Sequence, residues 1–136
     1  MRPTPPPGRP RPILVVDDDA AIRRVVAAVL ADEGYTVAEA PDGGAALARA
    51  RAAPPRLILL DMRMPGMDGW EFAREFRTRH GHGAPIIVVT AEASARRRAE
   101  EITADGFLGK PFGAAELMMT AQRHLPCAED GHPPTG

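Results

Sequence analysis

The residues of this chain best suited to chemistry are a few acids, a hydroxyl and an ammonium, each placed directly after a short apolar run. They are Asp17 and Asp18, Asp61, Thr90 and Lys110. Carboxylates brought together repel one another, and a hard cation such as Mg²⁺, which prefers oxygen ligands, offsets that repulsion. With the cation present, Asp61 can attack a phosphoryl group while Thr90 and Lys110 bind the oxygens that gain negative charge. The set predicts that an aspartate accepts a phosphoryl group.

Lys110 stands out for a second reason, because it is the only lysine among 17 basic residues. Arginine is a broad, planar cation, whereas lysine is a compact point charge on a flexible stem. A chain that otherwise uses arginine and keeps one lysine at a strand end indicates that an ammonium is needed there.

The apolar runs before these residues have the pattern of strands buried on both faces of a parallel sheet. We expect strands at Ile13–Val16, Tyr35–Ala38, Leu57–Leu60, Ile86–Val89 and Gly106–Gly109. The predicted helices include Asp42–Ala53, Ala93–Ala104, Ala114–Leu125 and a first helix that turns inward Ile22, Val25, Val26, Val29 and Leu30. Strands that alternate with helices through short loops predict an α/β fold, a doubly wound parallel sheet with helices on both faces. The strand ends would then share one ligand-binding edge.

Composition narrows the class of protein. The chain has 136 residues, a net charge of -1 and one cysteine, Cys127, so it suits a single domain without disulfides and gives no argument for nucleic acid or membrane partners. It contains neither a signal peptide nor a membrane-spanning run, and we expect it to be cytoplasmic. The proline-rich stretch 1–12 predicts an unpacked tail, 126–136 a flexible one, and 13–125 the domain.

Four segments, taken in order, resemble the receiver domain of two-component response regulators: I-L-V-V-D-D-D, D-M-R-M-P-G-M-D-G, V-V-T-A and G-K-P-F. The resemblance implies a flavodoxin-like, five-stranded sheet of strand order 2-1-3-4-5, which periodicity alone does not give. Because eleven residues follow Leu125, we expect a stand-alone receiver, similar to the chemotaxis regulator, that acts through a protein partner as a monomer or weak dimer.

The resemblance also implies roles for the acids. Asp61 would accept a phosphoryl group from a phosphohistidine on a sensor histidine kinase or a histidine phosphotransfer protein. Asp18, Asp61 and the backbone carbonyl of Arg63 would coordinate Mg²⁺ directly, and Asp17 would act partly through water. The expected function is therefore a phosphorelay switch that catalyses only its own phosphorylation and dephosphorylation.

A conformational switch is implied as well. Thr90, Ala91 and Lys110 would bind the phosphoryl group, and Phe107 would fill the space that the Thr90 hydroxyl leaves as it moves inward. The family often has tyrosine or histidine at the position of Phe107, so this chain lacks a polar tip there. The last strand and its flanking helices would be read by the downstream partner, and the Lys110–Pro111 peptide bond is expected to be cis.

Two other classes of protein stay open. Aspartate-nucleophile phosphatases also place an acid at a strand end, but they carry a second aspartate two positions later as general acid, where this chain has Arg63. A receiver-like interaction module without phosphorylation is the other alternative, and the intact set of acids, Thr90 and Lys110 argues against it.

Arg63 and Glu92 suggest a further expectation, because they lie two residues after Asp61 and Thr90 on neighbouring loops. A pair between their side chains would cover the site and obstruct the water that hydrolyses an aspartyl phosphate. Two independent, solvated side chains are the equally open alternative.

Overall fold

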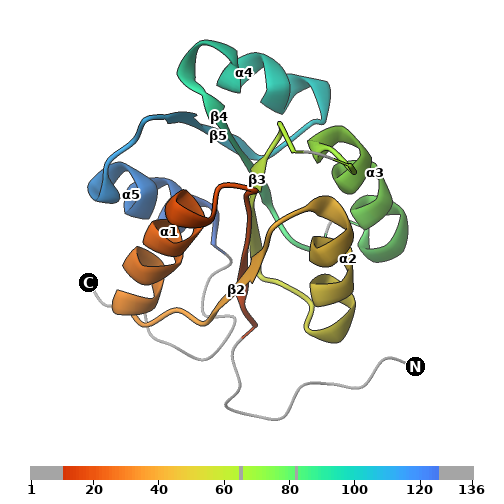
Figure 1. Ribbon diagram of the computed structural model, residues 1–136, viewed down its shortest axis with the longest axis horizontal. Helices are drawn as coiled ribbons and strands as arrows, with labels where there is room; N and C mark the ends of the chain where they lie inside the picture. The colour runs from red at the N-terminus through yellow and green to blue at the C-terminus, as the bar shows by residue number, and fades with distance from the viewer. Residues whose placement is uncertain (1–10, 65, 82, 126–136) are drawn as a thin grey trace.

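The computed structural model describes residues 11–64, 66–81 and 83–125. Within them, strands and helices alternate along the chain (Figure 1): β1 (Ile13–Val16), α1 (Ala20–Asp32), β2 (Val37–Ala40), α2 (Gly43–Ala52), β3 (Leu57–Asp61), α3 (Gly69–His80), β4 (Ile86–Ala91), α4 (Glu92–Glu101), β5 (Gly106–Lys110) and α5 (Ala114–His124). The strands form one parallel five-stranded sheet in the order β2-β1-β3-β4-β5. The predicted doubly wound fold and its flavodoxin-like strand order are confirmed.

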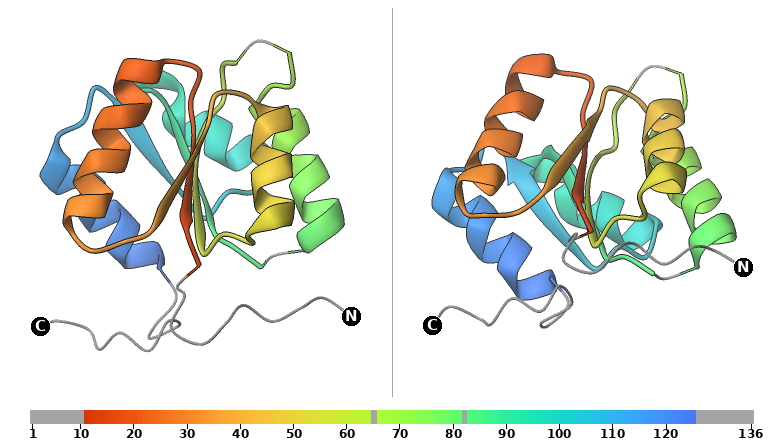
Figure 2. Two further views of the ribbon diagram at one scale, coloured as in Figure 1. Left: turned by 60° about the horizontal axis from the view of Figure 1, so that its bottom comes forward. Right: turned by 90° about the horizontal axis from the view of Figure 1, so that it is seen from below.

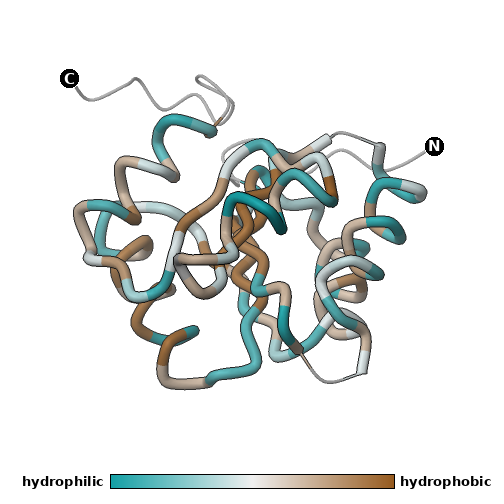
Figure 3. The backbone as a smooth tube through the Cα atoms, turned by 90° about the horizontal axis from the view of Figure 1, so that it is seen from above, coloured by the Kyte–Doolittle hydropathy of each residue, from teal (hydrophilic) through white to brown (hydrophobic). Residues whose placement is uncertain are grey.

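Helices cover both faces of the sheet, with α1 and α5 on one side and α2, α3 and α4 on the other (Figure 2). Side chains in a strand alternate between faces. In β1, Leu14 and Val16 therefore join the core under α2 and α3, whereas Ile13 and Val15 join the core under α1 and α5. The chain segments with the most hydrophobic residues accordingly run through the centre of the molecule (Figure 3). No helix of the described segments is long and apolar enough to cross a membrane.

Three of the helices that follow strands begin at a capping aspartate. Asp19 accepts hydrogen bonds from the backbone N–H groups at the start of α1, Asp42 does the same for α2, and Asp68 for α3. Such caps satisfy donors that the first helical turn leaves unpaired. They also fix how each chain segment turns at the carboxyl edge of the sheet, where the candidate site lies.

The second strand differs from its predicted range, because β2 covers Val37–Ala40 and not Tyr35–Ala38. Glu39 lies one residue beyond the predicted range, yet it is inside the strand and pairs in register with Val15. Like Val15, Glu39 points to the face of the sheet that α1 covers. There its carboxylate accepts a hydrogen bond from Arg23 at 3.1 Å. Arg23 thus gives a charged side chain in this strand a polar partner.

Two further predictions need correction in the helices. Val25 was expected to face inward, but it is 62% exposed. The residues of α1 that are buried against the sheet are Val26, Ala27 and Leu30, and Val25 lies outside this buried face. The helix predicted at Ala93–Ala104 ends at Glu101. Thr103 has φ 52°, a left-handed conformation that cannot continue a helix.

The predicted unpacked tail is wrong for its last two residues. The Arg11 guanidinium donates to the backbone carbonyls of Pro54, Pro55 and Gly83. Pro12 is buried, and its carbonyl accepts from the N–H of Arg56 at 2.8 Å. Backbone polar groups before β3 and β4 need hydrogen-bond partners. Arg11 donates to the carbonyls among them, and the Pro12 carbonyl accepts from the Arg56 N–H. The rest of the predicted tails, 1–10 and 126–136, lies outside the described residues.

Candidate functional site

Three acids meet at the carboxyl ends of the neighbouring strands β1 and β3. One carboxylate oxygen each from Asp17, Asp18 and Asp61 lies within 4.8 Å of the others. Asp17 is 4% and Asp61 5% exposed, whereas Asp18 is exposed to solvent. Chain connections leave β1 and β3 in opposite directions, toward β2 and β4, which makes this the switch point where α/β sheets bind ligands. The structure brings together the acids that the sequence singled out.

Lys110 reaches the same cluster from the end of β5. Its Nζ atom lies 3.0 Å from Asp17 Oδ2 and 3.6 Å from Asp61 Oδ2. Burial alone would lower the pKa of this ammonium, but the hydrogen bond to Asp17 and the charges of Asp61 and Asp17 outweigh burial and raise it. Lys110 is therefore protonated at neutral pH and supplies a fixed positive charge beside two buried carboxylates.

Asp61 is the acid that its surroundings perturb most clearly. Burial raises the pKa of Asp61 to about 6, and this outweighs the opposing effects of the Arg63 N–H and the Lys110 charge. Asp17 raises the pKa further through its own charge. A negative charge at this position is thus costly in spite of Lys110, and an added positive charge would relieve that cost.

The loop between β3 and α3 wraps closely around Asp61. Asp61 Oδ1 accepts a hydrogen bond from the Arg63 N–H at 3.0 Å, and Gly69 N donates to the carbonyl of Met62 at 3.3 Å. A Cβ atom added at Gly69 would lie 2.5 Å from Met62 Sδ and 2.8 Å from Met62 Cα. Only a residue without a side chain lets α3 start this near to the end of β3.

Replacement Gly69→Ala is expected to destabilise the protein by about 2 kcal/mol, because the new methyl overlaps backbone and cannot be accommodated by rotating a side chain alone. Gly44→Ala is the matched control, since the nearest atom to its Cβ is 3.5 Å away, an ordinary contact. That change should instead stabilise α2 by about 0.5–1 kcal/mol. Urea unfolding of both variants measures the two effects, and shifts of the same sign would contradict this account of Gly69.

Thr90 and Ala91 complete β4 beside the cluster. Thr90 is 3% exposed and pairs in register with Gly109, while Ala91 is exposed and pairs with Lys110. Phe107 pairs with Val88, two positions before Thr90, so that the phenyl ring and the Thr90 side chain share one face of the sheet. Both residues lie on the face that α4 covers.

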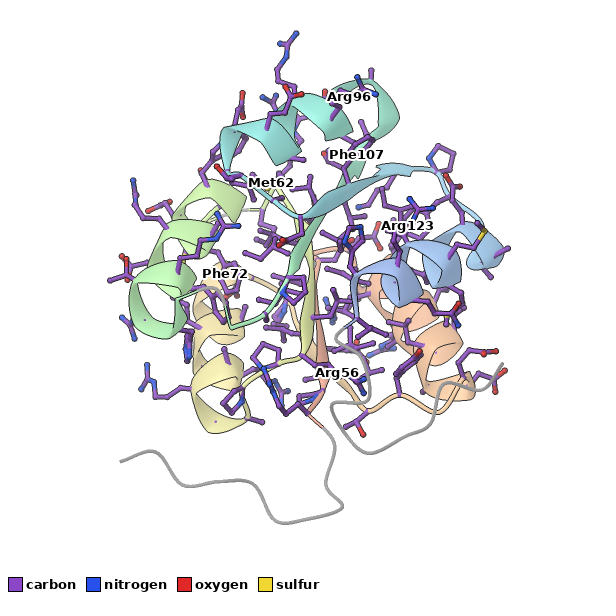
Figure 4. The ribbon with its side chains drawn as sticks, turned by 180° about the vertical axis from the view of Figure 1, so that it is seen from behind. Arg56, Met62, Phe72, Arg96, Phe107 and Arg123 are labelled. Atoms are coloured by element: carbon purple, nitrogen blue, oxygen red, sulfur yellow. The ribbon has the colours of Figure 1, made fainter. Side chains whose placement is uncertain are left out.

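Phe107 does not fill the interior of this face. It is 44% exposed, and the Arg96 guanidinium lies 5.9 Å from its ring centroid. Figure 4 shows Phe107 on β5 beneath Arg96 of α4. A cation near an aromatic face is a favourable contact. The ring therefore occupies an outward position between β5 and α4, from which a move toward Thr90 would be an inward one.

The far end of α4 is tied to α3. The Trp70 indole N–H donates to Glu101 at 2.9 Å, and the Arg98 guanidinium lies 5.2 Å from the centroid of the same indole. Arg77 donates to the carbonyl of Thr103 at 2.8 Å. The N-terminal end of α4, next to Ala91, has no side-chain cap. The anchored end of this helix is thus the end away from the acid cluster.

Of the remaining site predictions, the structure confirms one and leaves another untested. The Lys110–Pro111 peptide bond is cis, the geometry expected from the sequence. Arg63 is exposed next to Asp61. The side chain of Glu92 lies outside the described residues, so its pairing with Arg63 stays a prediction.

Arg23 and Glu39 were not singled out in the sequence, although they reach the site. Arg23 Nη1 donates to the carbonyl oxygen of Asp17 at 2.8 Å, and its Nε donates to Glu39 Oε1 at 3.1 Å. The available signal was an arginine four residues after the capping Asp19, one turn into the helix above the acids.

Fold and site together define a doubly wound α/β domain with a carboxylate cluster and one lysine at its switch point. A family model described as the response regulator receiver domain matches residues 13–122, and the chain belongs to that family. It is accordingly a receiver domain of two-component response regulators, and the phosphatase alternative is not favoured.

Individual relatives agree. The transcriptional regulatory protein ResD of Bacillus subtilis is 40% identical over 115 residues, which cover 83% of this chain and 47% of ResD. The structure of the chemotaxis response regulator CheY4 of Vibrio cholerae has 38% identity and a TM-score of 0.78, over 85% of this chain and 98% of that one. The NtrX receiver domain of Brucella abortus has 35% identity and a TM-score of 0.77, over 83% and 97%. The chain spans about half the length of the curated relatives it matches.

Proposed function

We propose that Asp61 accepts a phosphoryl group from the phosphohistidine of a histidine kinase or a histidine phosphotransfer protein, with Mg²⁺ as cofactor, and that this modification changes the contacts of the domain with a downstream protein. One observation carries the proposal. The carboxylates of Asp17, Asp18 and Asp61 lie within 4.8 Å of one another at the strand ends, with the Lys110 ammonium against two of them.

The donor set fits a divalent cation. Mg²⁺ prefers oxygen ligands and keeps several waters, and an acid cluster with one exposed member, Asp18, leaves room for them. Burial that raises the pKa of Asp61 indicates that the cluster lacks sufficient positive charge by itself. The carboxylates of Asp17, Asp18 and Asp61 and the backbone carbonyl of Arg63 would hold the ion. When bound, Mg²⁺ supplies positive charge that offsets the negative charge of the carboxylates and of the phosphoryl oxygens.

The transfer moves the phosphoryl group from a histidine nitrogen to an aspartate oxygen. A carboxylate oxygen of Asp61 forms the new bond to phosphorus, the phosphorus–nitrogen bond of the phosphohistidine breaks, and its electron pair stays on the imidazole nitrogen, which takes up a proton. Lys110, the Thr90 hydroxyl and Ala91 would bind phosphoryl oxygens. We assign the chain no chemistry beyond its own phosphorylation and dephosphorylation.

The output would pass through β5 and α4. As the Thr90 hydroxyl turns toward the phosphoryl oxygen, the space it leaves on its face of the sheet would admit Phe107, which is now 44% exposed. Arg96 would lose its aromatic partner, and the uncapped start of α4 would move with it. A downstream protein would read the changed surface of β5 and its flanking helices.

The test is incubation with a radiolabelled small acyl phosphate, with Mg²⁺ or with a chelator. We expect labelling only with Mg²⁺, and the label should be stable in acid and released by alkali, as an acyl phosphate is. Amide hydrogen exchange should change in β5 and α4 on labelling, and in α2 much less. Absence of labelling would support the unphosphorylated interaction module, and continuous turnover of phosphate esters would support the phosphatase.

A further inference from the structure

Arg23 connects three elements around the acid cluster. It lies in α1, its side chain is 14% exposed, and its guanidinium bridges the end of β1 and the edge strand β2. Nη1 donates to the carbonyl oxygen of Asp17 at 2.8 Å while Nε donates to Glu39 Oε1 at 3.1 Å. A planar guanidinium with two separate acceptors has its orientation fixed. The contact with Asp17 is therefore a directed one.

That contact completes the fixation of Asp17. Its N–H donates to the carbonyl of Ala40 at 3.1 Å, its Oδ1 accepts from the Asp19 N–H at 2.9 Å, and its Oδ2 lies 3.0 Å from Lys110 Nζ. The carbonyl oxygen is the remaining polar atom of this residue, and Arg23 binds it. Asp17 is consequently held at its backbone and side-chain polar atoms alike.

The carbonyl of Asp17 belongs to the peptide unit that leads into Asp18. A peptide unit is planar, so fixing its oxygen fixes the plane and with it the direction in which the next residue leaves. Asp18 is exposed, and its position relative to the cluster depends on this backbone direction more than on packing. We propose that Arg23, oriented by Glu39, is a positioning residue of the metal site that holds the Asp18 carboxylate against Asp61.

This inference rests on the proposed binding of Mg²⁺. It predicts that removing Arg23 changes the Mg²⁺ affinity in the direction opposite to the one that charge repulsion alone would give. Arg23 is a cation near a site for a cation, so its charge alone repels the metal, and its removal would tighten binding. If Arg23 instead positions Asp18, its removal weakens binding, because one ligand is no longer held in place. The direction of the change therefore separates the two effects.

The experiment is titration calorimetry of Mg²⁺ binding to the unphosphorylated chain. Arg23→Ala is expected to weaken binding about 10-fold, the lower end of what removal of an outer-shell partner does to metal sites. Arg24→Ala is the matched control, because it removes the same charge from the next residue of α1, whose side chain is exposed, and it should leave the Kd within about 2-fold. Glu39→Gln should stay close to wild type, since the amide oxygen still accepts from Nε.

Each outcome decides a separate point. Failure of the wild-type chain to bind Mg²⁺ would overturn the proposed function and not only the role of Arg23. Binding by wild type with an equal or lower Kd in Arg23→Ala would overturn the positioning role alone, and so would a lower melting temperature with an unchanged Kd. If Arg23→Ala does not fold, Arg23→Lys replaces it. Its single ammonium cannot bridge both acceptors, so weaker binding is expected, and an unchanged Kd overturns the inference.

Discussion

Asp61→Asn is expected to reduce Mg²⁺-dependent labelling by a small acyl phosphate to background. Asparagine has nearly the same shape but lacks an anionic oxygen that can form a bond to phosphorus, so the nucleophile is lost while the site keeps its form. Of the clustered acids, Asp61 also lies at the end of the central strand β3, next to Lys110 and the β3–α3 loop. Electrophoresis of the labelled protein followed by autoradiography measures the effect.

The matched control is Asp19→Asn. Asp19 is an exposed acid two positions from Asp17, it caps α1, and asparagine caps helices about as well as aspartate. This variant should label at close to the wild-type rate. Full labelling of Asp61→Asn would move the acceptor to another acid, and equal loss in both variants would indicate that charge near the site matters more than the identity of the nucleophile.

The composition of the site could be predicted because its members carry a local signal. Asp61, Thr90 and Lys110 each follow an apolar strand, and parallel strands bring their carboxyl ends to one edge whatever their order. Their convergence therefore followed from the fold class alone. The strand order did not, since every order of the same strands produces the same periodicity, and it entered through the resemblance to receivers.

Features that depend on tertiary contacts were the ones missed. Val25 fits the helical spacing of its neighbours, but only contact with the rest of the fold decides which side chains of α1 are buried, and Val25 is 62% exposed. Glu39 of β2 and Arg23 of α1 form one ion pair, and the role of either residue is recognisable only when the two are seen together. Sequence patterns describe single elements, so such pairs become visible only in the folded chain.

The charge of Asp61 is expected to make the stability of the protein depend on pH. Because the pKa of Asp61 is raised, the folded protein favours the protonated carboxyl. The contribution to stability is fully present below the ordinary pKa of 3.8 and is lost as the pH rises through about 6. A difference of this size corresponds to about 3 kcal/mol. In chelator at pH 8, Asp61→Asn should therefore be more stable than wild type by about that amount, and the gap should close below about pH 4. Urea unfolding across this pH range measures it.

Asp18→Asn is the control for this effect, because Asp18 belongs to the same cluster but is exposed, so that water already solvates its charge. Its stability should stay within about 0.5 kcal/mol of wild type at either pH. Adding Mg²⁺ at pH 8 should stabilise the wild-type chain more than Asp61→Asn, since the ion binds the folded carboxylates and the variant lacks one of them. A gap between Asp61→Asn and wild type that is equally large at pH 4 and pH 8 would show that shape, and not the buried charge, controls stability at this site.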